Sequence, residues 1–456
     1  MSAQTKNPVR DMTEGKPMGL ILGFSLPLLA GNLFQQFYTL IDTMIVGRFL
    51  GKYALAGVGS TGSINFLIIG FCMGICGGFS IPAAQRFGAG DYKNLRRFVA
   101  NSLYLGGAIS IVLTITVCLL CDDILRIMNT PSDVTDYAYS YIMVIFIGIP
   151  ITIFYNLLAG IIRALGDSRH PVIFLVVSSF INIGLDLVFI LVFRIGVIGA
   201  ALATVISQGI SAVCCLVFIR RNMTILRFEE ERELSPDTHY MKTLLAMGIP
   251  MGLQYSITAI GSVVLQTAVN ALGSDAVAAI TSAQRVSMFF CCPFDAFGLT
   301  MSTWGGQHVG ARKLDRIGRG MRDCIILGAV YSLIAFAVLF FFGDVLVSMF
   351  LGKGEPVIIA ASHKYLIINS LFYIPLALVN IVRFLIQGIG FPTFAILAGV
   401  CEMLARAGVA LLLVPAAGFT GACFANPSAW IAADLFLIPA YRYEMSRLRR
   451  DMKDGE

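Results

Sequence analysis

The chain has 456 residues, of which 57% are hydrophobic and 13% are charged, whereas soluble domains carry about 25% charged residues. This excess of apolar residues excludes an ordinary soluble protein and predicts an integral membrane protein, because each spanning helix needs about 20 mostly apolar residues. The net charge of +6 does not indicate a nucleic-acid partner, since the basic residues lie in short polar loops.

Apolar runs separated by charged or turn-forming residues predict an all-α fold with twelve transmembrane helices. The first run follows a polar tail and is too long for a signal-peptide core, so we expect it to remain as a helix. In chain order, the helices are expected at 18–46, 54–84, 98–120, 137–160, 171–193, 197–219, 243–271, 277–304, 323–350, 365–388, 393–415 and 419–441.

The basic residues predict which side of the membrane each loop occupies. An even number of helices places both termini on one side. Of the 33 lysines and arginines, 24 fall on that side, six fall on the opposite side, and three (Arg285, Arg383 and Arg406) lie within spans. Because cytoplasmic loops are rich in Lys and Arg, we expect a multi-pass protein of the inner (plasma) membrane with both termini in the cytoplasm.

An internal repeat divides the chain into two halves about 222 residues apart. The segment 85–89 (QRFGA) recurs as 307–311 (QHVGA), and the Gly-Ala-rich segment 196–203 recurs as 418–425. Six helices per half give both halves the same orientation, as in transporters built from parallel repeats. We expect an N-terminal lobe at 1–225, a cytoplasmic linker at 226–242, a C-terminal lobe at 243–441 and a cytoplasmic tail at 442–456.

Polar side chains share one layer in the outer half of the first lobe. At about 1.5 Å per helical residue, Asp42 lies about 9 Å and Asp186 about 12 Å from the outer ends of their helices. Thr204 and Tyr141 fall at similar depths. Asn182 lies four residues before Asp186 and therefore on the same helix face. Ionisable residues within a membrane are usually functional.

This layer has the chemistry of a cation site. A carboxyl group held out of water beside a second one retains a proton more readily, and with Asn and Thr oxygens the same pair could hold Na+. A cationic compound would compete for the same negative charge. Alternatively, Asp42 is a helix-end acid paired with Arg48, Asn182 and Thr204 make ordinary interhelical hydrogen bonds, and Tyr141 belongs to an interfacial aromatic belt.

Acids of the second lobe have a different pattern. Glu402 and Arg406 are four residues apart, which predicts an intrahelical ion pair. Asp295 and Asp434 lie deep in their spans and, with Tyr141 of the first lobe, are candidate substrate-cleft residues. Alternatively, the two acids are partners of Arg285 or Arg383. In the first lobe, Pro27 interrupts the backbone hydrogen bonds of the first helix, and we expect a bend there that brings Asp42 towards the fifth helix.

Several short motifs, in this order, resemble the MATE (multidrug and toxic compound extrusion) family over nearly the whole chain. They are Pro27 with 42–47 (DTMIVG), the repeated Gln-x-x-Gly-Ala element, 163–167 (RALGD) and 182–186 (NIGLD). The resemblance implies a V-shaped, two-lobe antiporter that exports amphiphilic, often cationic compounds in exchange for H+ or Na+. In the DinF-like branch, the coupling residues would be Asp42 and Asp186, with Asn182 and Thr204 as neighbours.

Other branches of the family place a carboxylate in the seventh helix after its proline and another in the tenth. Neither the residues that follow Pro250 nor the run 365–390 contains one. This departure favours coupling in the first lobe.

The expected partners are small organic molecules and the lipid bilayer, and we expect a monomer. No phosphate-binding P-loop occurs and the four histidines are scattered, so we expect no ATP site, no metal cluster and no cofactor other than the coupling ion. One alternative is a flippase of a lipid-linked saccharide precursor, which would need several basic residues in its cavity. A more remote one is an integral membrane enzyme, which would need a polar catalytic cluster on a loop.

Overall fold

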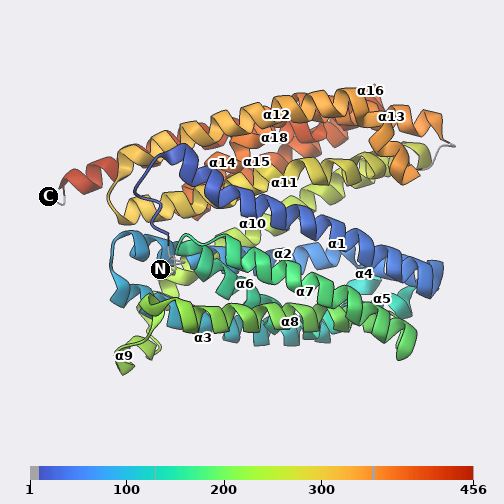
Figure 1. Ribbon diagram of the computed structural model, residues 1–456. Helices are drawn as coiled ribbons and strands as arrows, with labels where there is room; N and C mark the ends of the chain where they lie inside the picture. The colour runs from blue at the N-terminus through green and yellow to red at the C-terminus, as the bar shows by residue number, and fades with distance from the viewer. Residues whose placement is uncertain (1–9, 129, 352–354, 455–456) are drawn as a thin grey trace, which may run out of the picture. The chain divides into compact units, whose positions relative to one another are not determined.

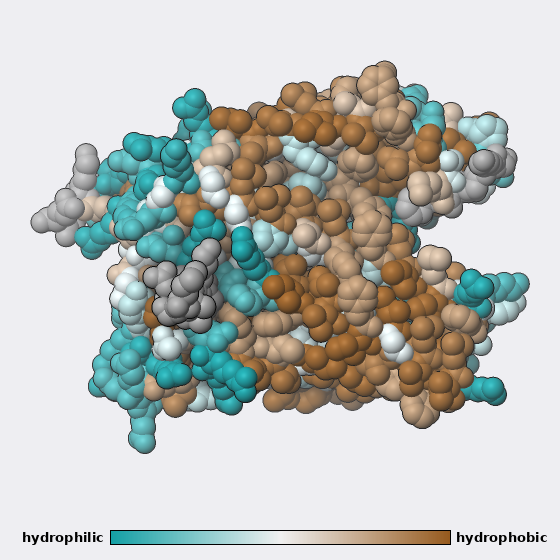
Figure 2. Space-filling view, viewed as in Figure 1, coloured by the Kyte–Doolittle hydropathy of each residue, from teal (hydrophilic) through white to brown (hydrophobic). Residues whose placement is uncertain are grey.

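The computed structural model describes residues 10–128, 130–351 and 355–454, which form helices and contain no strand (Figure 1). Ten helices of this part are long and apolar enough to cross a membrane. Two bent pairs, Thr135–Ile147 with Ile149–Ala164 and Pro356–Leu371 with Tyr373–Gly388, raise the number of candidate spans to twelve. The predicted all-α plan is confirmed. Apolar side chains cover the middle of the helices, and polar ones gather at their ends (Figure 2).

The described chain divides into two compact units. The first unit contains residues 10–12 and Ala30–Gly252, and the second contains Thr13–Leu29 and residues 253–454. These units reflect packing rather than repeat boundaries, so the predicted limits of the lobes, linker and tail remain predictions. Residues 1–9 of the predicted first tail and 455–456 of the last lie outside the described chain.

Eight α-helices and two short helical turns belong wholly to the first unit. They are α2 (Gly62–Gly88), α3 (Tyr92–Leu119), α4 (Cys121–Ile127), α5 (Thr135–Ile147), α6 (Ile149–Ala164), α7 (Arg169–Leu187), the π-helix η1 (Val188–Val192), α8 (Val197–Asn222), the 3-10 turn η2 (Thr224–Leu226) and α9 (Glu231–Leu234).

The second unit has the corresponding set. Its helices are α11 (Ser274–Gly310), α12 (Leu314–Leu351), α13 (Pro356–Leu371), α14 (Tyr373–Gly388), α15 (Pro392–Gly408), the π-helix η3 (Val409–Leu413), α16 (Val414–Ala417), α17 (Phe419–Cys423) and α18 (Ala425–Asp454).

Two long helices, α1 (Pro17–Ser60) and α10 (Thr238–Asn270), contribute to both units. The change of unit follows Leu29 in α1 and Gly252 in α10, two residues after the prolines Pro27 and Pro250 that lie inside these helices. A proline removes one helical hydrogen bond. A proline therefore interrupts the helical hydrogen bonding at the matching position of each half.

The first part of α10 packs closely on α2 in the first unit. A Cβ atom on Gly74 would lie 2.4 Å from the Met251 carbonyl oxygen, and one on Gly78 would lie 2.5 Å from the Gly248 Cα atom. Gly74 and Gly78 on α2 are spaced like Gly248 and Gly252 on α10, as in the small-residue motifs that let membrane helices approach each other.

In the second unit, the start of α1 is held by polar contacts. Lys313 Nζ donates to Thr13 Oγ1 at 3.0 Å, and Arg316 Nη2 donates to the Gly15 carbonyl oxygen at 2.7 Å.

Backbone conformation repeats with the sequence. Six of the eight left-handed glycines of the described chain form three pairs. The π-helices η1 and η3 follow α7 and α15, and the two helix pairs bend by 48° and 52°. The glycine pairs, with φ in parentheses, are Gly51 (85°) and Gly273 (98°), Gly166 (87°) and Gly390 (109°), and Gly196 (64°) and Gly418 (57°). Such φ values favour glycine, which explains why these positions match between the halves.

The charged segment before α10 is attached to the first unit. The Arg96 guanidinium on α3 donates to both carboxylate oxygens of Glu233 at 2.8 Å, and Arg97 donates to Asp237 at 3.1 Å. Arg96 holds the pKa of Glu233 below its usual value of 4.5. The expected linker is thus fastened to α3 by ion pairs.

Some helix ends differ from the predicted spans. The second span begins at Gly62 rather than 54, because the chain breaks at Gly51 and then forms further helical turns to Ser60. The predicted last tail is helical as far as Asp454 in α18.

Candidate functional site

Four helices of the first unit bring the predicted polar residues together. Asp42 lies on α1, Asn182 and Asp186 lie one turn apart on α7, Thr204 lies on α8, and Tyr141 lies on α5. Tyr38, one turn before Asp42 on α1, also joins the group. We call these six residues the first-unit polar cluster.

Thr204 is the hydrogen-bonding centre of this cluster. Its Oγ1 accepts from Asn182 Nδ2 at 3.4 Å and lies 3.5 Å from the Tyr38 hydroxyl. The same Oγ1 donates to the Ala200 carbonyl oxygen at 3.1 Å. Because its one proton is used there, the Tyr38 hydroxyl is the donor towards Thr204.

The two carboxyl groups of the cluster are neighbours. Asp42 and Asp186 lie close enough to interact through their side chains, and the buried Tyr141 ring stands beside both. Asn182 and Asp186 are 0% exposed, and Asp42 is half-buried. Two acids thus share a small volume from which water is largely excluded.

Apart from the contact between the Asp42 and Asp186 carboxyl groups, four buried oxygen atoms of the cluster have no hydrogen-bond partner in the described chain. They are Asp42 Oδ1, Asn182 Oδ1, and both Oδ1 and Oδ2 of Asp186. Buried polar atoms are nearly always paired, and an ionised carboxylate only accepts. Oxygen atoms of this kind suit a proton or a hard monovalent cation.

No basic side chain of the described residues forms an ion pair with Asp42 or Asp186. Arg48, the alternative partner proposed for Asp42, is exposed. The helix-end ion pair is therefore absent from the described structure.

The surrounding packing holds α1 and α8 against α7. A Cβ atom on Gly31 of α1 would lie 2.9 Å from Val172 Cγ2 on α7. Ser211 on α8 donates to Ser178 Oγ on α7 at 2.7 Å. The π-helix η1 begins two residues after Asp186, and such local distortions often accompany functional sites.

The sequence interpretation missed Tyr38. The available signal was its position four residues before Asp42, on the same face of the first helix, but a tyrosine in an apolar run was not sufficient to identify it.

The acids of the second unit have other surroundings. Glu402 on α15 contacts Arg383 on α14 and, at 3.4 Å, Arg406 on its own helix. The predicted Glu402–Arg406 pair is present, and Arg383 makes it a buried three-residue cluster, which we call the second-unit ion cluster. Asp434 on α18 is buried beside it. Asp295 on α11 is exposed and forms no ion pair in the described chain.

The second repeat has no acidic counterparts of Asp42 and Asp186. Between the matched prolines and the matched glycines of the two halves, Asp42 corresponds to Val264 or Leu265. By the same comparison, Asp186 corresponds to a position within 408–410 (GVA). The neighbouring carboxyl pair is confined to the first repeat.

Comparison with known proteins agrees with this architecture. The MatE family's sequence model matches residues 27–188 and again 250–412, which confirms the internal repeat. The probable multidrug resistance protein YoeA of Bacillus subtilis (strain 168) is 31% identical over 357 residues, 77% of each chain. YpnP, a probable multidrug resistance protein of the same strain, is 29% identical over 363 residues, 80% of each chain. A crystal structure of MATE in complex with MaL6 superposes with a TM-score of 0.90 at 24% identity, covering 98% of this chain and all of the other.

Proposed function

Because the chain belongs to the MatE family, whose members are transporters rather than enzymes, we propose that it exports amphiphilic, often cationic organic compounds in exchange for H+ or Na+. The two Bacillus subtilis relatives described as probable multidrug resistance proteins support this substrate class.

The single observation that carries the coupling proposal is the carboxyl pair Asp42–Asp186 with unpartnered oxygen atoms and no basic neighbour. A buried charge without a partner is unfavourable, so this pair favours a bound proton or cation. Asn182 Oδ1 offers a further acceptor for Na+. Thr204 Oγ1 accepts from Asn182 Nδ2 and from the Tyr38 hydroxyl. These bonds occupy its lone pairs, so Thr204 orients Asn182 rather than contacting the ion.

Exchange follows from competition for this negative charge. While a proton or Na+ neutralises the pair, a cationic compound gains little from approaching it. When the ion leaves, the negative charge returns and attracts the compound. A ligand shifts the equilibrium between two conformations only if it binds one of them more tightly than the other. Alternating access therefore requires that the ion and the compound each bind the two conformations with different affinities.

The first helix connects the pair to the rest of the molecule. Asp42 lies on the part of α1 that belongs to the first unit, and Pro27 precedes the change of unit by two residues. We expect α1 to bend near Pro27 when the charge state of Asp42 changes, and the bend to bring Asp42 towards α7.

The described structure does not favour the flippase alternative. An anionic diphosphate would need unpaired basic residues within the spans. Arg383 and Arg406 both contact Glu402, so neither offers a free positive charge. Arg285, exposed on α11, is the one arginine of the predicted spans without an ion pair among the described residues, and a single charge is fewer than such a cavity needs.

We further propose a monomer in the plasma membrane. The asymmetry of basic residues supports an orientation with both termini in the cytoplasm. A protease-sensitive tag at the carboxyl terminus should be protected in intact cells and cleaved in inside-out vesicles. Cleavage in intact cells would contradict this orientation.

The test is dye exchange in proteoliposomes with an imposed pH gradient or an imposed Na+ gradient. Asp42→Asn and Asp186→Asn should each lose gradient-driven exchange of a cationic dye. The gradient that drives the wild type identifies the coupling ion.

Asp136→Asn is the matched control, since this acid lies exposed at the start of α5 in the same unit. It should exchange dye at the wild-type rate. Wild-type exchange by both Asp42→Asn and Asp186→Asn would exclude coupling at this site.

A further inference from the structure

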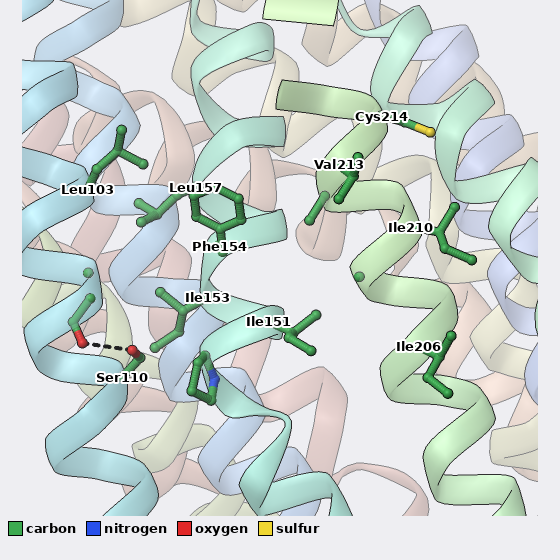
Figure 3. A pocket seen from close by; sticks show the side chains of 15 residues that line it. Leu103, Ser110, Ile151, Ile153, Phe154, Leu157, Ile206, Ile210, Val213 and Cys214 are labelled. Atoms are coloured by element: carbon green, nitrogen blue, oxygen red, sulfur yellow. Dashed lines mark hydrogen bonds between the residues drawn. The ribbon is translucent and has the colours of Figure 1, made fainter. Parts of the chain in front are cut away.

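An apolar groove opens between α3, α6 and α8 in the first unit, with a volume of about 710 Å³. Figure 3 shows side chains from all three helices lining it. Leu103 comes from α3, Phe154 and Leu157 from α6, and Ile206 and Ile210 from α8. Its size lies within the range of about 300–1,000 Å³ that is typical of small-molecule sites.

Small residues create the groove. A Cβ atom on Gly107 would meet nothing within 4 Å, and the nearest atom to one on Gly209 is Ile151 Cγ2 at 3.6 Å. The Ser110 hydroxyl donates to the Gly107 carbonyl oxygen at 2.7 Å, a bond drawn in Figure 3. The polar side chain of the wall is therefore already paired, and the groove suits a hydrocarbon.

The groove continues towards the end of α8. A second hollow of about 310 Å³ shares Val213 and Cys214 with the first, and is also lined by Phe174, Arg221 and Asn222. The two adjoining hollows are mostly apolar, and the second, between α7 and α8, reaches the basic residue Arg221.

Its length matches one leaflet of a bilayer. From Ile206 to Val217, α8 rises about 17 Å at 1.5 Å per residue, and half of the hydrocarbon core is about 15 Å. Arg221 follows one turn later, at the level where a phospholipid carries its phosphate. Arg220 and Arg221 are exposed, and no carboxylate of the described residues forms an ion pair with either of them.

We propose that this groove binds an acyl chain of an anionic phospholipid, whose headgroup lies on Arg221 with Arg220 nearby. Placing this lipid site in the cytoplasmic leaflet depends on the membrane orientation proposed above. The site itself does not depend on the proposed antiport. The two positive charges attract an anionic headgroup and repel a cationic compound. They therefore favour a lipid over the exported substrates.

The experiment uses the full-length protein in phosphatidylcholine vesicles that contain a trace of lipid spin-labelled on its acyl chain. Electron paramagnetic resonance measures the fraction of label immobilised by the protein. Spin-labelled phosphatidylglycerol should be immobilised more strongly than spin-labelled phosphatidylcholine, and 1 M salt should reduce this preference.

Two kinds of variant distinguish binding of the lipid headgroup from binding of its acyl chain. Arg220→Gln with Arg221→Gln should lower the preference for phosphatidylglycerol by about five-fold per arginine, since one basic residue near a membrane surface is worth about 1 kcal/mol. Gly107→Leu fills the groove and should release both lipids. Val213→Trp, which substitutes an exposed residue of the same groove, checks this result if Gly107→Leu folds poorly.

Gly59→Leu is the matched control, because its Cβ atom would also meet nothing within 4 Å but lies outside the groove. It should immobilise as much lipid as the wild type. Equal immobilisation of the two lipids by the wild type, or unchanged immobilisation in both groove-filling variants, would overturn the proposal. So would a cationic spin-labelled amphiphile that binds as strongly as phosphatidylglycerol and is released by Gly107→Leu. None of these readouts requires transport, so they are independent of the coupling test.

Discussion

The two units bury acidic residues in opposite ways. In the first unit, Asp42 and Asp186 adjoin each other without a basic partner. In the second, Glu402 lies between Arg383 and Arg406. A carboxylate held by two guanidinium groups is neutralised by the protein itself and has a fixed structural role. A carboxyl pair without such partners is available to an ion that comes and goes.

This difference arises on nearly the same backbone. The paired left-handed glycines, the two π-helices and the two helix bends repeat from one half to the other. The acids do not repeat. The two halves therefore share a backbone plan, and individual residues decide which half holds a carboxyl pair without a basic partner in the described chain.

The largest expected effect on stability is in the second-unit ion cluster. Glu402→Gln should lower the free energy of unfolding by about 3–5 kcal/mol, because it leaves two buried guanidinium groups without their carboxylate. Unfolding in mixed micelles measures this value. Asp275→Asn, which changes an exposed acid at the start of α11 in the same unit, should stay within about 0.5 kcal/mol. Equal effects of the two variants would show that the arginines do not depend on Glu402.

A smaller effect is expected where Arg96, near the start of α3, binds the Glu233 carboxylate. Glu233→Gln should weaken attachment of the linker by about 1.5–3 kcal/mol, the typical value of hydrogen bonds to charged groups. Since Arg96 lowers the pKa of Glu233 below 4.5, this contribution is complete above pH 4.5 and is lost as the pH falls through the lowered value. Amide hydrogen exchange of residues 224–237 measures the change.

The control for this prediction is Glu231→Gln, because Glu231 is exposed in the same short helix. It should leave hydrogen exchange of the linker unchanged. Similar exchange rates in Glu233→Gln and the wild type would refute the proposed attachment.

Within the first-unit polar cluster, Thr204→Val should lower the free energy of unfolding by about 1 kcal/mol. It removes the acceptor of Tyr38 and Asn182, and interhelical hydrogen bonds in membranes average about 0.6 kcal/mol each. Thr204→Ser retains the hydroxyl and should be nearly neutral. Unfolding in the same micelles compares the two. If Thr204→Ser lowered the free energy of unfolding as much as Thr204→Val, packing of the Thr204 methyl group rather than its hydrogen bonds would be responsible.

The smallest effect on stability is expected for Asp186→Asn, although it should abolish exchange. The amide nearly preserves the volume of the side chain and removes a charge that has no basic partner, so the free energy of unfolding should change by no more than about 1 kcal/mol. A loss comparable to that in Glu402→Gln would mean that Asp186 is a structural ion-pair residue, and the contrast between the two units would fail.

Much of the site was predictable because depth in a membrane can be read along the chain. Counting residues from the helix ends placed Asp42, Asp186, Thr204 and Tyr141 in one layer, and the structure brings them together. The count contains no information on rotation about each helix axis. Consequently Tyr38 was missed, and Asp434 could not be assigned to the neighbourhood of Glu402.

The sequence alone determined the number of candidate membrane spans, their internal repeat and the depth of each acid in the membrane. This was possible because bilayer thickness and helical rise relate residue number to depth. Tertiary structure decided which charges are neutralised. Arg383 reaches Glu402 from another helix, whereas no basic side chain in the described part of the first unit forms an ion pair with Asp42 or Asp186. The close approach of α2 and α10 likewise required glycines from segments about 170 residues apart to meet face to face. Such encounters depend on packing between distant parts of the chain, which local sequence patterns do not encode.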